Sequence, residues 1–145
     1  MFTIDASVHI SAFNPAEIDS AESQAFIKLI QWKGLAVFSP TLLLVEVAAS
    51  VARVFNDTAR GTELMYALQS LRGQTWVPLD ESLAQEAGRM GAEYRLRGAD
   101  AVYGAVAQRN GTTLVTLDQQ QLERLKPALS VQRPGDALAA FSGGY

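Results

Sequence analysis

Short apolar segments alternate along this chain with longer segments of helical periodicity. The segments expected to form strands cover residues 2–5, 35–40, 75–79 and 112–118, with a last short one near 129–131. The segments between them have helical spacing or composition and cover residues 7–13, 16–32, 41–56, 59–71, 81–96 and 96–108. Such alternation predicts a three-layer α/β/α fold, in which a central parallel sheet of about four to five strands is covered by helices on both faces.

The length and composition are those of one folded domain. The 145 residues are expected to form a single domain, 1–145, and a hydrophobic content of 48% against 19% charged residues supports a packed core. The chain starts without a basic segment and a long apolar run, and its longest apolar stretch, Leu42–Val45, is far too short for a membrane span. We therefore expect no membrane association and a cytoplasmic location.

The composition also excludes several kinds of site. There is no cysteine and only one histidine, His9, which excludes disulfides, cysteine nucleophiles and Cys/His zinc sites. The net charge of −3 gives no overall attraction to nucleic acid. A polyanionic substrate would therefore have to be held by local Arg and Lys side chains or by bound cations.

Three aspartates are expected at one edge of the sheet. Asp5 and Asp118 end two of the expected strands, and ligands of open parallel sheets bind outside the carboxyl ends of the strands. Asp100 lies near the start of the helical segment LRGADAVYGAVAQ and reaches the same edge if that helix begins there. The alternative is that Asp100 only accepts backbone N–H groups and interacts with the helix dipole.

Glu46 is the only ionisable residue in the apolar segment LLLVEVAA, residues 42–49. Burial of an isolated carboxylate costs several kcal/mol or raises its pKa until it is neutral, so a buried Glu46 needs a compensating partner. In the alternative interpretation Glu46, Ser50 and Arg53 form a solvated stripe on an otherwise buried helix. Spacing alone leaves both interpretations open.

The order of these residues resembles that of the PIN-domain nucleases, and most closely the stand-alone VapC-type toxins. The matching stretches are IDASV, SPTLLLVEVAASV, LRGADAVYGAVAQ and TLVTLDQQQLERL. The resemblance implies a PIN-like fold and carries the acidic site over to Asp5, Glu46, Asp100 and Asp118. The supporting hydroxyl corresponds to Thr116, and Ser7 is a further supporting residue. Many relatives carry another Asp or Asn shortly after the last aspartate, where this chain has Gln119–Gln121, so binding of a second metal ion is in question.

The chemistry of such a site requires a cation. Two carboxylates about 5 Å apart repel by roughly 3 kcal/mol at an effective dielectric of about 20, and a bound divalent ion reverses that sign. Mg²⁺ or Mn²⁺ prefers the hard oxygen ligands that this composition offers. In the expected arrangement Asp5, Glu46 and Asp100 hold the main ion, and Asp118 orients a water or a second ion.

The resemblance implies an activity and two partners. The activity is metal-dependent hydrolysis of RNA phosphodiester bonds that leaves a 5′-phosphate. The protein would be the toxin of a toxin–antitoxin pair, a homodimer inhibited by a small antitoxin protein that blocks the acidic cleft. Two alternatives remain: a non-catalytic PIN fold that binds a partner, and a phospho-acceptor signalling domain, although Asp5 lacks the acidic neighbour that such a domain needs.

The remaining residues allow two interpretations each. His9 is expected to be a surface or packing residue rather than a general base. Three arginines, Arg95, Arg97 and Arg109, flank the Asp100 segment and either bind phosphates or serve solubility and the helix dipole. The aromatic residues are expected in the core or at a subunit interface rather than as stacking platforms for bases: Phe26, Trp32, Phe55, Tyr66 and Trp76.

Overall fold

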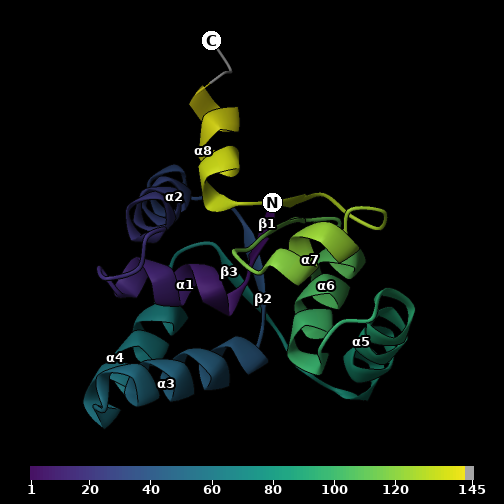
Figure 1. Ribbon diagram of the computed structural model, residues 1–145, viewed down its shortest axis with the longest axis horizontal. Helices are drawn as coiled ribbons and strands as arrows, with labels where there is room; N and C mark the ends of the chain where they lie inside the picture. The colour runs from purple at the N-terminus through teal and green to yellow at the C-terminus, as the bar shows by residue number, and fades with distance from the viewer. Residues whose placement is uncertain (143–145) are drawn as a thin grey trace.

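A five-stranded parallel sheet forms the centre of the computed structural model, which describes residues 1–142 (Figure 1). The last three residues of the domain expected over 1–145 lie outside this range. The strands are β1 (Phe2–Ile4), β2 (Val37–Pro40), β3 (Gln74–Val77), β4 (Thr113–Val115) and β5 (Val131–Gln132). The helices are α1 (Ala6–Phe13), α2 (Ser20–Lys33), α3 (Leu42–Phe55), α4 (Thr58–Gln69), α5 (Glu81–Tyr94), α6 (Gly98–Asn110), α7 (Gln119–Arg124) and α8 (Pro134–Ser142).

The strand order is β3-β2-β1-β4-β5, with β1 in the middle. From β1 the chain moves outward through β2 to β3, then returns across the sheet to place β4 on the other side of β1. The β1–β4 pairing brings Ile4 opposite Val115, so both strands end at the same level. The direction of winding therefore reverses between β1 and β4, which is where open α/β sheets bind ligands beyond the strand ends.

Helices cover both faces of the sheet, as the alternating pattern predicts. Neighbouring residues of β4 show the two faces: Val115 packs in a core cluster with Phe26 and Ile30 of α2, while Leu114 packs with Tyr103 and Ala107 of α6. Figure 1 shows α1 and α2 on one side of the strands and α5, α6 and α7 on the other. Residues of α3 and α4, Leu43 and Leu68 among them, pack in the same core cluster as Tyr103 of α6. The expected α/β fold with four to five parallel strands is confirmed.

The helix expected over 16–32 is wrong at its start. The chain forms turns up to Asp19, and α2 begins at Ser20, so that Ile18 is fully exposed instead of lying on the apolar face. Two helices were not expected: α7, formed by a short polar stretch, and α8, which begins at Pro134, a residue suited to the first helical position.

Of the aromatic residues expected in the core or at a subunit interface, Phe26 lies in the core and two others do not. The Phe26 side chain is completely buried in the α2 face of the sheet. Trp32 is 80% exposed near the end of α2, and Tyr66 is exposed on α4. No helix within residues 1–142 is both long enough and apolar enough to cross a membrane.

Candidate active site

Two of the four acidic residues lie just after the strands on either side of the reversal point, Asp5 directly after β1 and Asp118 three residues past the end of β4. Asp5 follows β1 and caps α1, because its Oδ2 accepts a hydrogen bond from the Ser7 N–H at 2.9 Å. Asp118 follows β4 and caps α7, because its Oδ1 accepts from the Gln121 N–H at 2.9 Å. An aspartate at a helix N-cap satisfies a backbone donor that has no partner within the helix. Each residue therefore has one oxygen fixed in place by the fold.

The other two acidic residues come from helices that begin at the same edge. The α3 helix follows β2 after one residue, and Glu46 lies in its second turn. The α6 helix leads back to the start of β4, so its own start lies at the carboxyl end of the sheet and carries Asp100 there in its first turn. Glu46 is half-buried rather than part of a solvated stripe, whereas Arg53 on the same helix is exposed.

The pKa values of three of these carboxyls show that the four groups share one environment. Burial raises the pKa of Asp5, and the charge of Asp118 raises it further. Burial also raises the pKa of Glu46, with contributions from the charges of Asp5 and Asp100. For Asp100 the pKa is raised by burial and by the charges of Asp118 and Asp5. Like charges this close disfavour one another's ionised forms, so the cluster is under electrostatic strain.

Gln121 connects Asp5 to the start of α6 through hydrogen bonds of its side-chain amide. Its side chain is completely buried, and its Nε2 donates to Asp5 Oδ1 at 3.2 Å and to the Asp100 backbone carbonyl at 3.3 Å. The Thr116 hydroxyl donates to Gln121 Oε1, which fixes the orientation of the amide. The same Thr116 oxygen accepts from the Asp118 N–H at 3.0 Å. One neutral amide thus links the segments after β1 and β4 to the start of α6.

Tyr103 holds Glu46. Its hydroxyl donates to Glu46 Oε1 at 2.6 Å, and its ring is completely buried between α6 and the sheet. This hydrogen bond lowers the pKa of Glu46, opposing the effect of burial. Burial and the charges of Asp5 and Glu46 in turn raise the pKa of Tyr103 well above its ordinary value, so the hydroxyl stays protonated and remains a donor.

Arg97 pairs with two of the carboxylates. Its Nε donates to Asp100 Oδ2 at 3.2 Å and its Nη2 donates to Asp118 Oδ2 at 3.1 Å. Within residues 1–142, no three acidic or histidine side chains stand in an arrangement ready to chelate a metal ion. The positive charge that the structure places among these carboxylates is the guanidinium of Arg97.

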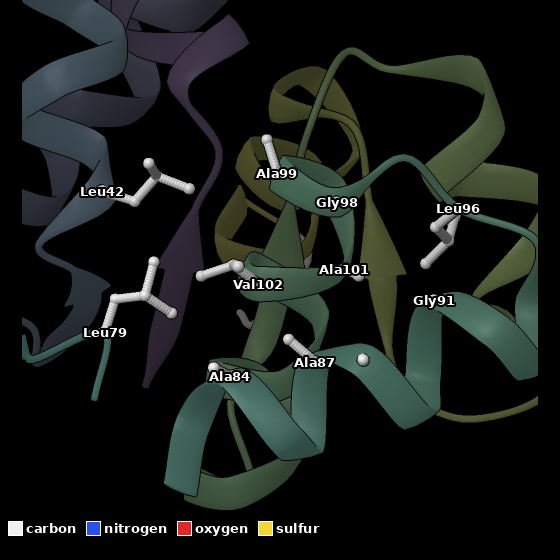
Figure 2. A pocket seen from close by; sticks show the side chains of 11 residues that line it. Leu42, Leu79, Ala84, Ala87, Gly91, Leu96, Gly98, Ala99, Ala101 and Val102 are labelled. Carbon is white, nitrogen blue, oxygen red and sulfur yellow. The ribbon is translucent and has the colours of Figure 1, made fainter. Parts of the chain in front are cut away.

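An apolar cavity of about 560 Å³ lies beside the start of α6. Gly98, Ala99, Ala101 and Val102, which flank Asp100, form one wall with residues of α5, and Leu42 and Leu79 form the other. Figure 2 shows Leu42 and Leu79 facing Val102 across the cavity. The cavity has no ionisable lining residue, so acid–base or metal chemistry belongs to the neighbouring carboxylates.

The sequence matches one protein family. The family model for the PIN domain matches residues 2–126, which is most of the chain. The chain belongs to the PIN domain family. The resemblance expected from the four acidic motifs is therefore confirmed at the level of the family.

Solved structures with the same fold include several toxin complexes. The PIN domain described here is similar to VapBC2 from Rickettsia felis, solved with a DNA fragment from its promoter (TM-score 0.69, 13% identity, 91% of this chain and 97% of that one). It is also similar to a toxin–antitoxin complex from Klebsiella pneumoniae (TM-score 0.66, 16% identity, 92% of this chain and 98% of that one). A third similar structure is VapC20 from Mycobacterium tuberculosis, a toxin that cleaves the sarcin–ricin loop (TM-score 0.69, 15% identity, 84% of this chain and 93% of that one). No curated protein matches the chain in sequence.

Asp5, Asp100 and Asp118 lie at the carboxyl edge of the sheet, where the sequence predicts them, and Glu46 lies near enough for the charges of Asp5 and Asp100 to raise its pKa. The roles of these four residues as metal ligands stay a prediction. The Thr116 hydroxyl bonds to Gln121 and to the Asp118 N–H. Ser7 is nearby, since its hydroxyl accepts from the Leu117 N–H at 3.1 Å. His9, expected to be a surface or packing residue, is buried in the core. Arg109, one of the three arginines considered as phosphate ligands, pairs with Glu86 of α5 at 3.0 Å.

Sequence reasoning missed two members of the site. Tyr103 is the one hydroxyl-bearing residue in the run AVYGAVA and lies three positions after Asp100, on the same side of the helix. Gln121 is three positions after the capping Asp118, where a helix turns back toward its cap. These two spacings, each of three residues from a predicted aspartate, could have indicated that Tyr103 and Gln121 lie near the site.

Proposed function

We propose that this PIN domain is a divalent-metal-dependent endoribonuclease, the toxin of a toxin–antitoxin pair acting in the cytoplasm. The observation that carries the proposal is the convergence of four carboxylates from four separate segments at the point where the sheet reverses its winding. Burial raises the pKa values of Asp5, Glu46 and Asp100, and the charges of neighbouring carboxylates in the cluster raise them further. Helix capping accounts for Asp5 and Asp118, but it gives no reason for Glu46 and Asp100 to lie beside them, and a catalytic cation supplies one.

The donor set fits Mg²⁺ or Mn²⁺. The side chains that would hold the ion are Asp5, Glu46, Asp100 and Asp118, all hard oxygen ligands, with no thiol in the chain. When bound, such an ion supplies the positive charge that a phosphodiester needs in order to approach four carboxylates, and it lowers the pKa of an attacking water. Because Arg97 pairs with Asp100 and Asp118, their use as ligands would require its displacement.

The chain's own residues prepare this site. Gln121 and the Ser7 N–H hold the two oxygens of Asp5, while Tyr103 holds one oxygen of Glu46 and leaves the other open. Thr116 binds the Asp118 N–H and fixes the turn after β4. Such supporting hydrogen bonds orient metal ligands and raise the affinity of a site. The proposed reaction is hydrolysis of RNA that leaves a 5′-phosphate.

The decisive experiment is cleavage of total cellular RNA by the purified protein with Mg²⁺, with Mn²⁺ and with chelator. We expect cleavage with either metal ion and none with chelator. Asp100→Asn should abolish cleavage while keeping the fold, because the amide is nearly isosteric but lacks the charge. A matched control is Asp57→Asn, which removes a carboxylate that caps α4 and whose hydrogen bond and ion pair are both with Arg60. Unchanged cleavage in Asp100→Asn would refute the assignment of Asp100, and no cleavage by the wild-type protein with either metal ion would favour a non-catalytic binding protein.

Two partners belong to the same proposal. The similarity in fold to the Klebsiella toxin–antitoxin complex supports an antitoxin that covers the acidic edge. Exposed apolar side chains on α3 and α4, Val45, Val54 and Tyr66, support a homodimer. Analytical ultracentrifugation of the purified protein tests the dimer, and a monomer at micromolar concentration would contradict it.

A further inference from the structure

Arg97 donates hydrogen bonds to Oδ2 of Asp100 and to Oδ2 of Asp118. Asp118 Oδ1 is occupied by the backbone of α7, so Oδ2 is its remaining oxygen, and that oxygen accepts from Arg97. Asp100 Oδ2 also accepts from Arg97. The Asp100 and Asp118 side chains are 13% and 21% exposed, so a ligand from solvent can reach both residues. The guanidinium and an incoming cation therefore need the same atoms.

The position of Arg97 is explained by these carboxylates alone. It is the N-cap residue of α6, but its side chain makes no capping hydrogen bond. A cation at the start of a helix also faces the positive end of the helix dipole, which is unfavourable. The side chain is 72% exposed, so little packing holds it. Asp100 on α6 and Asp118 at the start of α7 supply its attraction, and Gln121 shows that these two segments lie together (Figure 1).

We propose that Arg97 is an exchangeable internal counter-ion, an inference that rests on the proposed nuclease function. In the metal-free protein Arg97 neutralises Asp100 and Asp118 and so lowers the repulsion within the acidic cluster. On binding of a divalent cation, Arg97 gives up both carboxylates. The freed guanidinium lies at the rim of the site and binds a phosphate of the RNA, for which its planar donor geometry is suited.

The first test is calorimetric titration of Mg²⁺ into the wild-type protein, Arg97→Gln and Arg89→Gln. Arg89 is an exposed arginine of α5 with no ion pair within residues 1–142, so its variant makes the same change in net charge away from the site. We expect Arg97→Gln to bind Mg²⁺ about three- to tenfold more tightly than wild type, as expected for removal of an exposed competing charge. The gain should shrink at high salt. Equal affinity in Arg97→Gln and wild type would overturn the proposal.

The second test measures RNA affinity by fluorescence anisotropy of a labelled single-stranded RNA, with Ca²⁺ in place of Mg²⁺ and the RNA checked for integrity. Loss of one phosphate contact should weaken binding by Arg97→Gln and lower the slope of log affinity against log salt by about 0.7. Arg89→Gln should match wild type in both. Wild-type affinity and slope in Arg97→Gln would overturn the release of Arg97 to phosphate.

The two proposals fail in different ways. If wild-type protein shows no heat of Mg²⁺ or Mn²⁺ binding, the proposed nuclease function fails, and with it the reason for Arg97 to exchange. If wild type binds the ion and cleaves RNA but Arg97→Gln behaves identically, only the inference about Arg97 is refuted.

Discussion

His9 places a titratable group in the core of the protein. It is 2% exposed on α1, and the cavity of about 210 Å³ beside it is lined by apolar side chains, among them Ile27 of α2 and Leu64 and Leu68 of α4. Its Nε2 has no hydrogen-bond partner within residues 1–142. Burial lowers the pKa of His9 from its ordinary value of 6.5 to about 4, because the charged imidazolium cannot be solvated there.

The sign and size of the effect on stability follow from this difference. The folded state holds His9 neutral, whereas the unfolded state protonates it below pH 6.5. The stability that this neutral His9 allows is therefore complete above pH 6.5 and is lost as the pH falls from 6.5 to about 4. At about 1.4 kcal/mol per pH unit, the loss between these two values amounts to roughly 3 kcal/mol of the free energy of unfolding. Asp5, Glu46 and Asp100 act in the opposite direction, since their raised pKa values favour the folded state at low pH.

The difference between wild type and His9→Leu isolates His9 from the acidic groups, which are the same in both proteins. Urea unfolding is measured at pH 7.5, 6, 5 and 4 in the presence of chelator, so that no cation contributes. We expect the leucine variant to gain roughly 3 kcal/mol relative to wild type between pH 7.5 and pH 4. A difference in stability that stays constant over this range would refute the argument that burial holds His9 neutral.

Three further substitutions test the contacts that support the site and the packing of α6. Tyr103→Phe removes the donor to Glu46 and should weaken Mn²⁺ binding about 10- to 100-fold in a calorimetric titration, with an unchanged circular dichroism spectrum; undiminished binding would show that Glu46 needs no support. Gln121→Leu leaves the buried Asp5 Oδ1 and the Thr116 hydroxyl without their partner and should cost about 2 kcal/mol or more in urea unfolding, whereas wild-type stability would mean that water replaces the amide. Gly104→Ala places a Cβ 2.6 Å from Met90 Sδ and 3.2 Å from Leu125 Cδ1 and should cost about 1–3 kcal/mol, while the matched Gly88→Ala, with no atom within 4 Å, should not destabilise the protein.

Much of the architecture was predictable because it depends on chain direction. The alternation of strands and helices fixes a parallel sheet, and in such a sheet a residue directly after a strand lies at the carboxyl edge. Asp5 and Asp118 could therefore be placed without knowing the order of the strands. Placing Asp100 required one further inference. Because α6 leads into the start of β4, α6 itself begins at the carboxyl edge of the sheet. Their roles in catalysis stay predictions until the variants are measured.

The features that the sequence did not predict depend on contacts between distant segments. Periodicity within residues 42–49 could not show whether Glu46 turns toward solvent, since that depends on Tyr103 of another helix. The burial of Gln121 depends on Asp5 and the start of α6, both far away in sequence. The exposure of Trp32 likewise follows from where α2 ends over the sheet, which its own apolar pattern does not specify.

The central claim, that these four carboxylates hold a divalent cation, is tested most directly by a crystal structure of the protein with Mn²⁺ and measurement of the anomalous scattering. The account predicts one strong anomalous peak among Asp5, Glu46, Asp100 and Asp118, with oxygen ligands at the distances typical of a hard divalent ion, and with the guanidinium of Arg97 withdrawn from Asp100 and Asp118. A fully soaked crystal without a peak at this edge of the sheet, with Arg97 still bridging the two aspartates, would contradict it.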